Sequence, residues 1–153
     1  MTPLLQFSLF VIISSCTAIL CRGQGKVIWE FKADNSAGNE IVLNITGSIA
    51  PGWHLYSQFL EDGGPIPTHF IFNNSNEYQL IGNVSESGRS QKFFDKTFEM
   101  DIVWYTGLVS FSQKILLNKL PTSIKGHIEY MTCNSIVCIP DKRDFNFSIQ
   151  SPK

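Results

Sequence analysis

Apolar and polar side chains alternate with a period of two along most of this chain, and this alternation restricts the fold more than any other feature. It is clear in residues 27–32 (VIWEFK) and again in residues 41–45 (IVLNI). A period of two places every second side chain on one face of an extended strand, whereas a helix needs a period of 3.6. The chain is therefore expected to be built from strands.

Further candidate strands are separated by clusters of Gly, Pro, Asn and Ser, which favour turns. With residues 27–31 and 41–45, the expected strands are residues 69–72, 78–81, 98–105, 109–117, 124–131 and 145–149. About eight strands without a convincing amphipathic helix indicate an all-β, antiparallel sandwich. Two long connections, residues 57–68 and 83–96, are expected to be loops that carry function.

The first 23 residues are expected to be a signal peptide. Residues 4–20 are dominated by Leu, Phe, Val and Ile, and polar sequence follows Arg22. The mature domain is then residues 24–153, which is expected to be exported. A lipid anchor at Cys16 is an alternative, since residues 13–16 (ISSC) resemble a bacterial lipoprotein cleavage site. No second apolar run is long enough to span a bilayer.

Cys133 and Cys138 are then the two cysteines of the mature chain, and their close spacing allows two interpretations. A structural disulfide stabilises mainly by restricting the unfolded chain, and a ring of about six residues gives only about 2 kcal/mol. Thiol-disulfide exchange instead needs a pair that can close on itself after attack, which short spacing provides. Export permits either, because disulfides persist outside the reducing cytosol. No Lys, Arg or His lies within three residues of Cys138, so the neighbouring sequence does not show that its thiol is activated.

Charge and spacing argue against several other functions. The chain has 12 basic and 13 acidic residues without runs of either sign, so nucleic acid is not an expected partner. The three histidines are far apart in sequence, and one Cys pair lacks the second ligand pair of a structural zinc site, so no metal is expected. No cofactor other than a redox-active disulfide is expected.

Five segments in the right order resemble the N-terminal domain of the thiol:disulfide interchange protein DsbD. They are residues 52–57 (GWHLYS), 63–68 (GGPIPT), 78–82 (YQLIG), 94–98 (FDKTF), and 126–133 (GHIEYMTC) followed by 138–140 (CIP). The resemblance covers residues 27–149. It implies an immunoglobulin-like β-sandwich in the periplasm, which takes electrons from a thioredoxin-like domain and passes them to oxidised periplasmic proteins, with a possible link to cytochrome c maturation.

The resemblance also implies roles for individual residues. Cys138 would attack and form the mixed disulfide, and Cys133 would resolve it. Phe93, together with Phe94, matches an aromatic cap over the cysteines, and His54 and Tyr56 match a wall of the site. Alternation places His54 and Tyr56 on one strand face, while Trp53 and Leu55 take the other face and are expected in the core.

The chain departs from the family in two respects. Some relatives have acidic residues before the cap aromatics, where this chain has Gln91 and Lys92. Full-length members continue into a membrane-spanning electron carrier and a C-terminal thioredoxin-like domain, so the membrane thiol carrier is expected on a separate chain. The main hypothesis is a protein-disulfide reductase or electron-transfer module. The alternative is a non-catalytic sandwich that binds a partner protein or apolar ligand, with Cys133–Cys138 as a structural bridge.

Overall fold

The structure, a computed structural model, describes residues 25–96 and 98–150, and this part of the chain contains eight strands and no helix. The signal peptide expected at residues 1–23 and the alternative anchor at Cys16 lie outside the described residues. Nothing in the described ranges could cross a membrane as a helix. The strands are β1 (Val27–Ala37), β2 (Glu40–Ile49), β3 (His54–Tyr56), β4 (His69–Phe72), β5 (Tyr78–Asp95), β6 (Met100–Leu117), β7 (Thr122–Cys133) and β8 (Cys138–Ile149).

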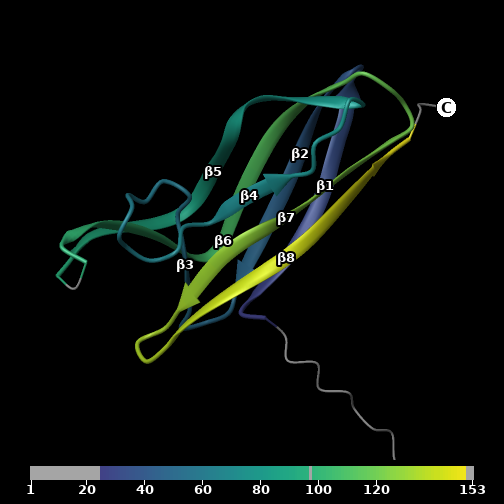
Figure 1. The fold of residues 1–153 in the computed structure, drawn as a ribbon. Coiled ribbons are helices and arrows are strands. Elements are labelled where there is room, and N and C mark those ends of the chain that lie inside the picture. Colours follow the sequence, from purple (N-terminus) through teal and green to yellow (C-terminus); the bar gives the residue numbers. More distant parts are fainter. Residues whose placement is uncertain (1–24, 97, 151–153) are drawn as a thin grey trace, which may run out of the picture.

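The strands form two antiparallel layers that are joined by the short strand β3 (Figure 1). One layer has the order β1-β2-β6-β5, and in the other β7 lies between β8 and β4. Leu55 in β3 pairs with Tyr105 of β6 on one side and with Thr132 of β7 on the other. The prediction of an all-β, immunoglobulin-like antiparallel sandwich is confirmed.

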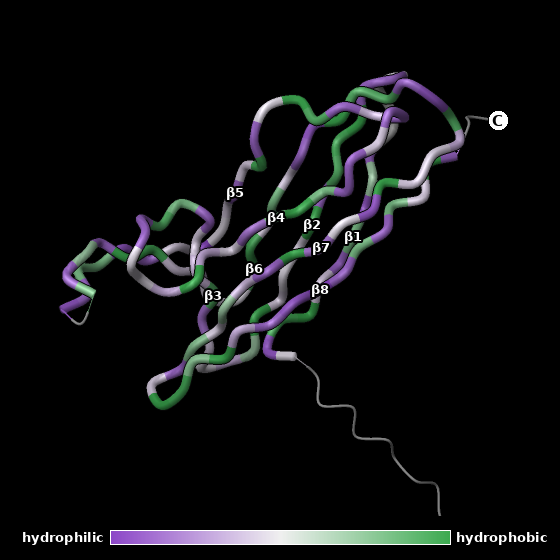
Figure 2. Tube along the Cα trace, viewed as in Figure 1, coloured by the Kyte–Doolittle hydropathy of each residue, from purple (hydrophilic) through white to green (hydrophobic). Residues whose placement is uncertain are grey.

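The core between the layers consists of the inward-facing residues of these strands. Strand β2 shows the predicted alternation, because Ile41, Leu43 and Ile45 are fully buried while the residues between them are not. Leu55 is fully buried, and Trp53 packs against the same core, as alternation predicted. Figure 2 shows apolar residues interrupting polar ones along these strands.

The prediction that residues 83–96 form a loop was wrong, because this segment continues β5. Ser85 pairs with Ser112, and Gln91 pairs with Trp104, along a long β5–β6 hairpin. The segment is polar because most of its side chains are exposed, and nothing but β6 pairs with its backbone in the described residues. The polar sequence of residues 83–95 therefore belongs to an exposed strand.

The two strands predicted at residues 98–105 and 109–117 are one strand, β6. Its buried positions change phase, from Ile102 to Tyr105 and Val109, which makes the sequence pattern look interrupted. Gly107 has φ 70°, a value that glycine adopts without a steric penalty, and the register to β5 shifts between Gly88 and Ser90. The strand therefore rotates here and buries a different face beyond the shift.

Candidate functional site

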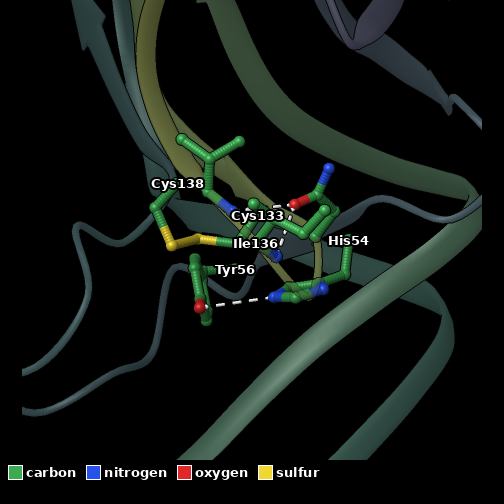
Figure 3. Close-up of a disulfide and its surroundings, with 7 residues drawn as sticks. His54, Tyr56, Cys133, Ile136 and Cys138 are labelled. Carbon is green, nitrogen blue, oxygen red and sulfur yellow. Dashed lines mark hydrogen bonds between the residues drawn. A yellow bond between two sulfur atoms is a disulfide. The ribbon is translucent and has the colours of Figure 1, made fainter.

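A disulfide joins Cys133 and Cys138 at the end of the β7–β8 hairpin (Figure 3). The backbone N–H of Asn134 donates to the carbonyl of Val137 at 3.0 Å. The side-chain oxygen of Asn134 accepts from the N–H groups of Ile136 and Val137, both at 2.8 Å. The two cysteines therefore face each other as a cross-strand pair, with Cα atoms 4.1 Å apart, next to a tightly bonded turn.

The two cysteines differ strongly in their exposure to solvent. Cys133 is only 2% exposed, whereas Cys138 is exposed. Around Cys138 the hairpin presents apolar side chains: Ile136 is 90% exposed, and Val137 and Ile139 are also exposed. A reagent approaching this disulfide from solvent therefore reaches Cys138 and meets an apolar surface beside it.

Cys133 is covered by a small apolar cluster, separate from the main core, which we call the cysteine cluster. Its buried members are Tyr56, Ile102 and Cys133. Partly buried side chains packed against them are Leu60, Phe93, Met100, Trp104 and Met131. The cluster brings together β3, β5, β6, β7 and the loop after β3, so the burial of one sulfur depends on five segments.

His54 and Tyr56, which the sequence analysis assigned to the site, lie beside the disulfide (Figure 3). His54 pairs with Cys133 across β3 and β7. Its Nε2 lies 3.3 Å from the hydroxyl of Tyr56, and its ring stacks on Trp104 with centroids 3.8 Å apart. Burial lowers the pKa of His54 below its ordinary value of 6.5, because a partly dry environment disfavours the charged imidazolium.

Of the two proposed cap residues, the structure brings only Phe93 to the cysteine cluster. Its ring lies 4.3 Å from that of Trp104, centroid to centroid. Phe94 points to the opposite face of β5 and is 59% exposed. In this structure Phe93 belongs to a paired strand rather than to a loop, so its position is fixed by β6.

Trp104 is the site residue that the sequence reasoning missed. It stacks between His54 and Phe93, and its Nε1–H donates to the side-chain oxygen of Gln91 at 3.1 Å. Its place on the same strand face as buried Ile102 was the available signal. Without the sheet register, nothing in the sequence placed that face opposite β3.

The nearby charges are few. Lys92 forms an exposed ion pair with Asp101 at 2.8 Å. Burial, and then the carboxylate of Asp95, raise the pKa of Tyr56 above 10.0, so this hydroxyl stays protonated at neutral pH. Aromatic side chains therefore surround the buried side of the disulfide.

The lowered pKa of His54 predicts a component of acid sensitivity. The unfolded chain regains the ordinary pKa, so it binds a proton more readily than the folded chain once the pH falls below 6.5. His54 thus contributes a loss of stability as the pH falls from about 7.5 through 6.5. In urea unfolding, His54→Gln should show a smaller loss over this range than the parent chain. Equal slopes for His54→Gln and the parent would contradict this expectation.

Comparison with known proteins gives one family and several structures. The family described as thiol:disulfide interchange protein DsbD, N-terminal, matches residues 24–148. No curated protein matches the chain. Similar solved structures include the N-terminal periplasmic domain of ScsB from Proteus mirabilis, with 18% identity and a TM-score of 0.59, covering 82% of this chain and 47% of that one. This chain therefore spans about half the length of that relative.

Two Neisseria meningitidis structures are also similar. The reduced DsbD N-terminal domain has 16% identity and a TM-score of 0.57, covering 82% of this chain and 87% of that one. A complex between the DsbD and PilB N-terminal domains has 17% identity and a TM-score of 0.48, covering 77% and 80%. At these identities, the ScsB domain and the reduced DsbD domain support the sandwich fold alone.

Proposed function

Because this chain belongs to the family of N-terminal domains of the thiol:disulfide interchange protein DsbD, we propose that it exchanges electrons with thioredoxin-like partners through the Cys133–Cys138 disulfide. The observation that carries the proposal is the unequal exposure of the two sulfurs, since an exchange site needs one sulfur that a partner can reach. A bridge that served only stability would have no need of this asymmetry.

In the proposed reaction, the thiolate of a reduced partner attacks Sγ of Cys138. The Cys133–Cys138 bond breaks, and Cys133 leaves as a thiolate while a mixed disulfide forms at Cys138. The second thiolate of the partner then attacks the partner's sulfur in the mixed disulfide. This step oxidises the partner and releases this chain with two thiols. The reverse sequence, with Cys138 attacking an oxidised protein and Cys133 resolving, passes the two electrons on.

The surroundings support distinct roles for the other site residues. The exposed apolar side chains at Ile136, Val137 and Ile139 provide a docking surface next to Cys138. Phe93 acts as a cap and His54 and Tyr56 as a wall, which together exclude water from Cys133. The disulfide itself is the redox group, with no further cofactor.

We place the domain in the periplasm, where a disulfide can persist and cycle. A membrane thiol carrier would supply the electrons through a thioredoxin-like domain, and oxidised periplasmic proteins would receive them. Export through a signal peptide at residues 1–23 is part of this proposal.

The test is to trap the mixed disulfide. Cys133→Ser leaves the exposed thiol of Cys138 without its resolving partner. Mixing it with a thioredoxin-like domain that keeps one cysteine of its pair, activated as a mixed disulfide with a small aromatic thiol, should release that thiol and accumulate a covalent complex on non-reducing gels. Cys138→Ser is the matched control and should accumulate none, because its remaining thiol is buried. If neither variant is trapped, or if both are trapped equally, the assignment of roles is wrong.

A further inference from the structure

Glu86 in β5 anchors the start of the loop between β3 and β4. Its carboxylate accepts hydrogen bonds from the hydroxyl of Ser57, from the backbone N–H of Gln58 at 3.0 Å, and from the hydroxyl of Tyr105 at 3.0 Å. The side chain of Gln58 adds a bond of 3.0 Å to the carbonyl of Val84, also in β5. One half-buried carboxylate with three donors thus holds this segment to the β5–β6 hairpin.

The anchored segment lies between two residues that cover Cys133. Tyr56 immediately precedes Ser57, and Leu60 is the second residue after Gln58. Both residues pack in the cysteine cluster. Thr68, at the far end of the loop, donates its hydroxyl to the carbonyl of Tyr56 at 2.6 Å. The loop is therefore fixed at both ends, and Glu86 provides the fixed point nearest to Leu60.

We propose that Glu86 is a positioning residue that keeps Cys133 covered, so that an incoming thiolate attacks Cys138 and not Cys133. This inference rests on the proposed exchange function of the disulfide and assigns to Glu86 the choice between its two sulfurs. Glu86 acts through Ser57 and Gln58, which lie between Tyr56 and Leu60 and hold these two residues in the cysteine cluster.

The two possible attacks give products that can be distinguished. Attack on Sγ of Cys138 breaks the disulfide, leaves the attacking thiol bonded to Cys138, and releases Cys133 as a thiolate. Attack on Sγ of Cys133 leaves the attacking thiol on Cys133 and releases Cys138. Thiol-disulfide exchange depends on which sulfur is accessible, so the ratio of the two products measures how well Cys133 is covered.

Glu86→Gln tests the proposal with little change in size. The amide carries no charge and keeps a single acceptor oxygen, so it cannot accept from Ser57, Gln58 and Tyr105 together, and the charge-assisted hydrogen bonds are lost. The oxidised chain is mixed with reduced glutathione, quenched in acid, alkylated, and mapped by peptide mass spectrometry. We expect the parent to carry at least about tenfold more glutathione on Cys138 than on Cys133, and Glu86→Gln to reduce this ratio by about threefold or more.

Glu77→Gln is the matched control. Glu77 accepts from Thr122 at 2.8 Å and from Lys119 at 3.2 Å, next to the start of β5 and therefore far along the strand from the cysteine cluster. This variant also loses a bonded carboxylate, so it should lower stability without changing the ratio. A folded Glu86→Gln protein with the parental ratio would overturn the proposal, as would an equal change in Glu77→Gln.

Tyr105→Phe keeps the test decisive if Glu86→Gln does not fold. It removes one donor to Glu86 and retains the buried ring, and we expect a smaller change of the ratio in the same direction. An unchanged ratio in this variant, with Glu86→Gln unfolded, would also count against the proposal. The outcome is independent of the trapping experiment: a changed ratio with no trapped thioredoxin-like partner would reject the proposed function and retain the role of Glu86.

Discussion

Replacing Gly126 with Ala is expected to lower the free energy of unfolding by about 3 kcal/mol or more, at the upper end of the cost of overpacking a core. Gly126 lies in β7, where it pairs with Phe72 of β4 and with Phe145 of β8. A Cβ atom here would overlap the carbonyl oxygen of Ile71 and lie 2.6 Å from the ring of Phe145. The backbone of β4 would have to move, because a carbonyl oxygen cannot rotate away as a side chain can.

The prediction is checked by urea unfolding of Gly126→Ala beside Lys125→Ala. Lys125 is the exposed neighbour on the same strand, and its backbone carbonyl, which accepts from the N–H of Asn73, is unaffected by the change. Lys125→Ala should stay within about 0.5 kcal/mol of the parent. If Gly126→Ala unfolds at the same urea concentration as Lys125→Ala, β4 is not held against β7 as the structure describes.

Much of the fold could be predicted from the sequence because burial alternates where a strand has one face toward a core. Strands β1, β2, β7 and β8 were each predicted in part from such alternation. Strand β5 beyond Ile81 was not, because most of its side chains are exposed and its polarity therefore resembles that of a loop. Strand β6 was divided in two for a different reason, since a rotation of the strand changes which face is buried.

The local sequence predicted the cysteine pair of the candidate site, and the family resemblance predicted Phe93, His54 and Tyr56. The spacing of Cys133 and Cys138 and the alternation of His54 and Tyr56 are local properties, and the structure gathers all four residues. Trp104 and Glu86 reach the site through register between strands far apart in sequence. Periodicity gives the face of a residue but not its cross-strand partner, so neither residue could be assigned from the sequence.

The arrangement of the hairpins explains why a small sandwich can treat two bonded sulfurs differently. The tip of the β7–β8 hairpin carries the exposed Cys138, while Cys133 packs in a cluster with side chains of β5, β6 and the loop after β3. The main core is separate from this cluster and holds the layers together by itself. The covering of Cys133 can therefore change without loss of the sandwich.

Trp104→Ala should show this separation. Trp104 packs between His54 and Phe93 at the edge of the cysteine cluster and is half-buried. Its loss should lower the free energy of unfolding by about 2–3 kcal/mol, somewhat less than for a fully buried aromatic side chain. Since burial lowers the pKa of His54, exposing one face of the imidazole should raise that pKa toward 6.5.

Urea unfolding and an NMR titration of the His54 ring would measure both effects. Trp104→Phe, which keeps an aromatic ring between His54 and Phe93, should recover most of the stability and the low pKa. Trp53→Ala is the second control, because Trp53 packs against the main core and should lower stability without moving the pKa of His54. An unchanged His54 pKa in Trp104→Ala would mean that Trp104 does not shield His54. The buried side of the disulfide would then depend on Tyr56 and the loop that Glu86 anchors.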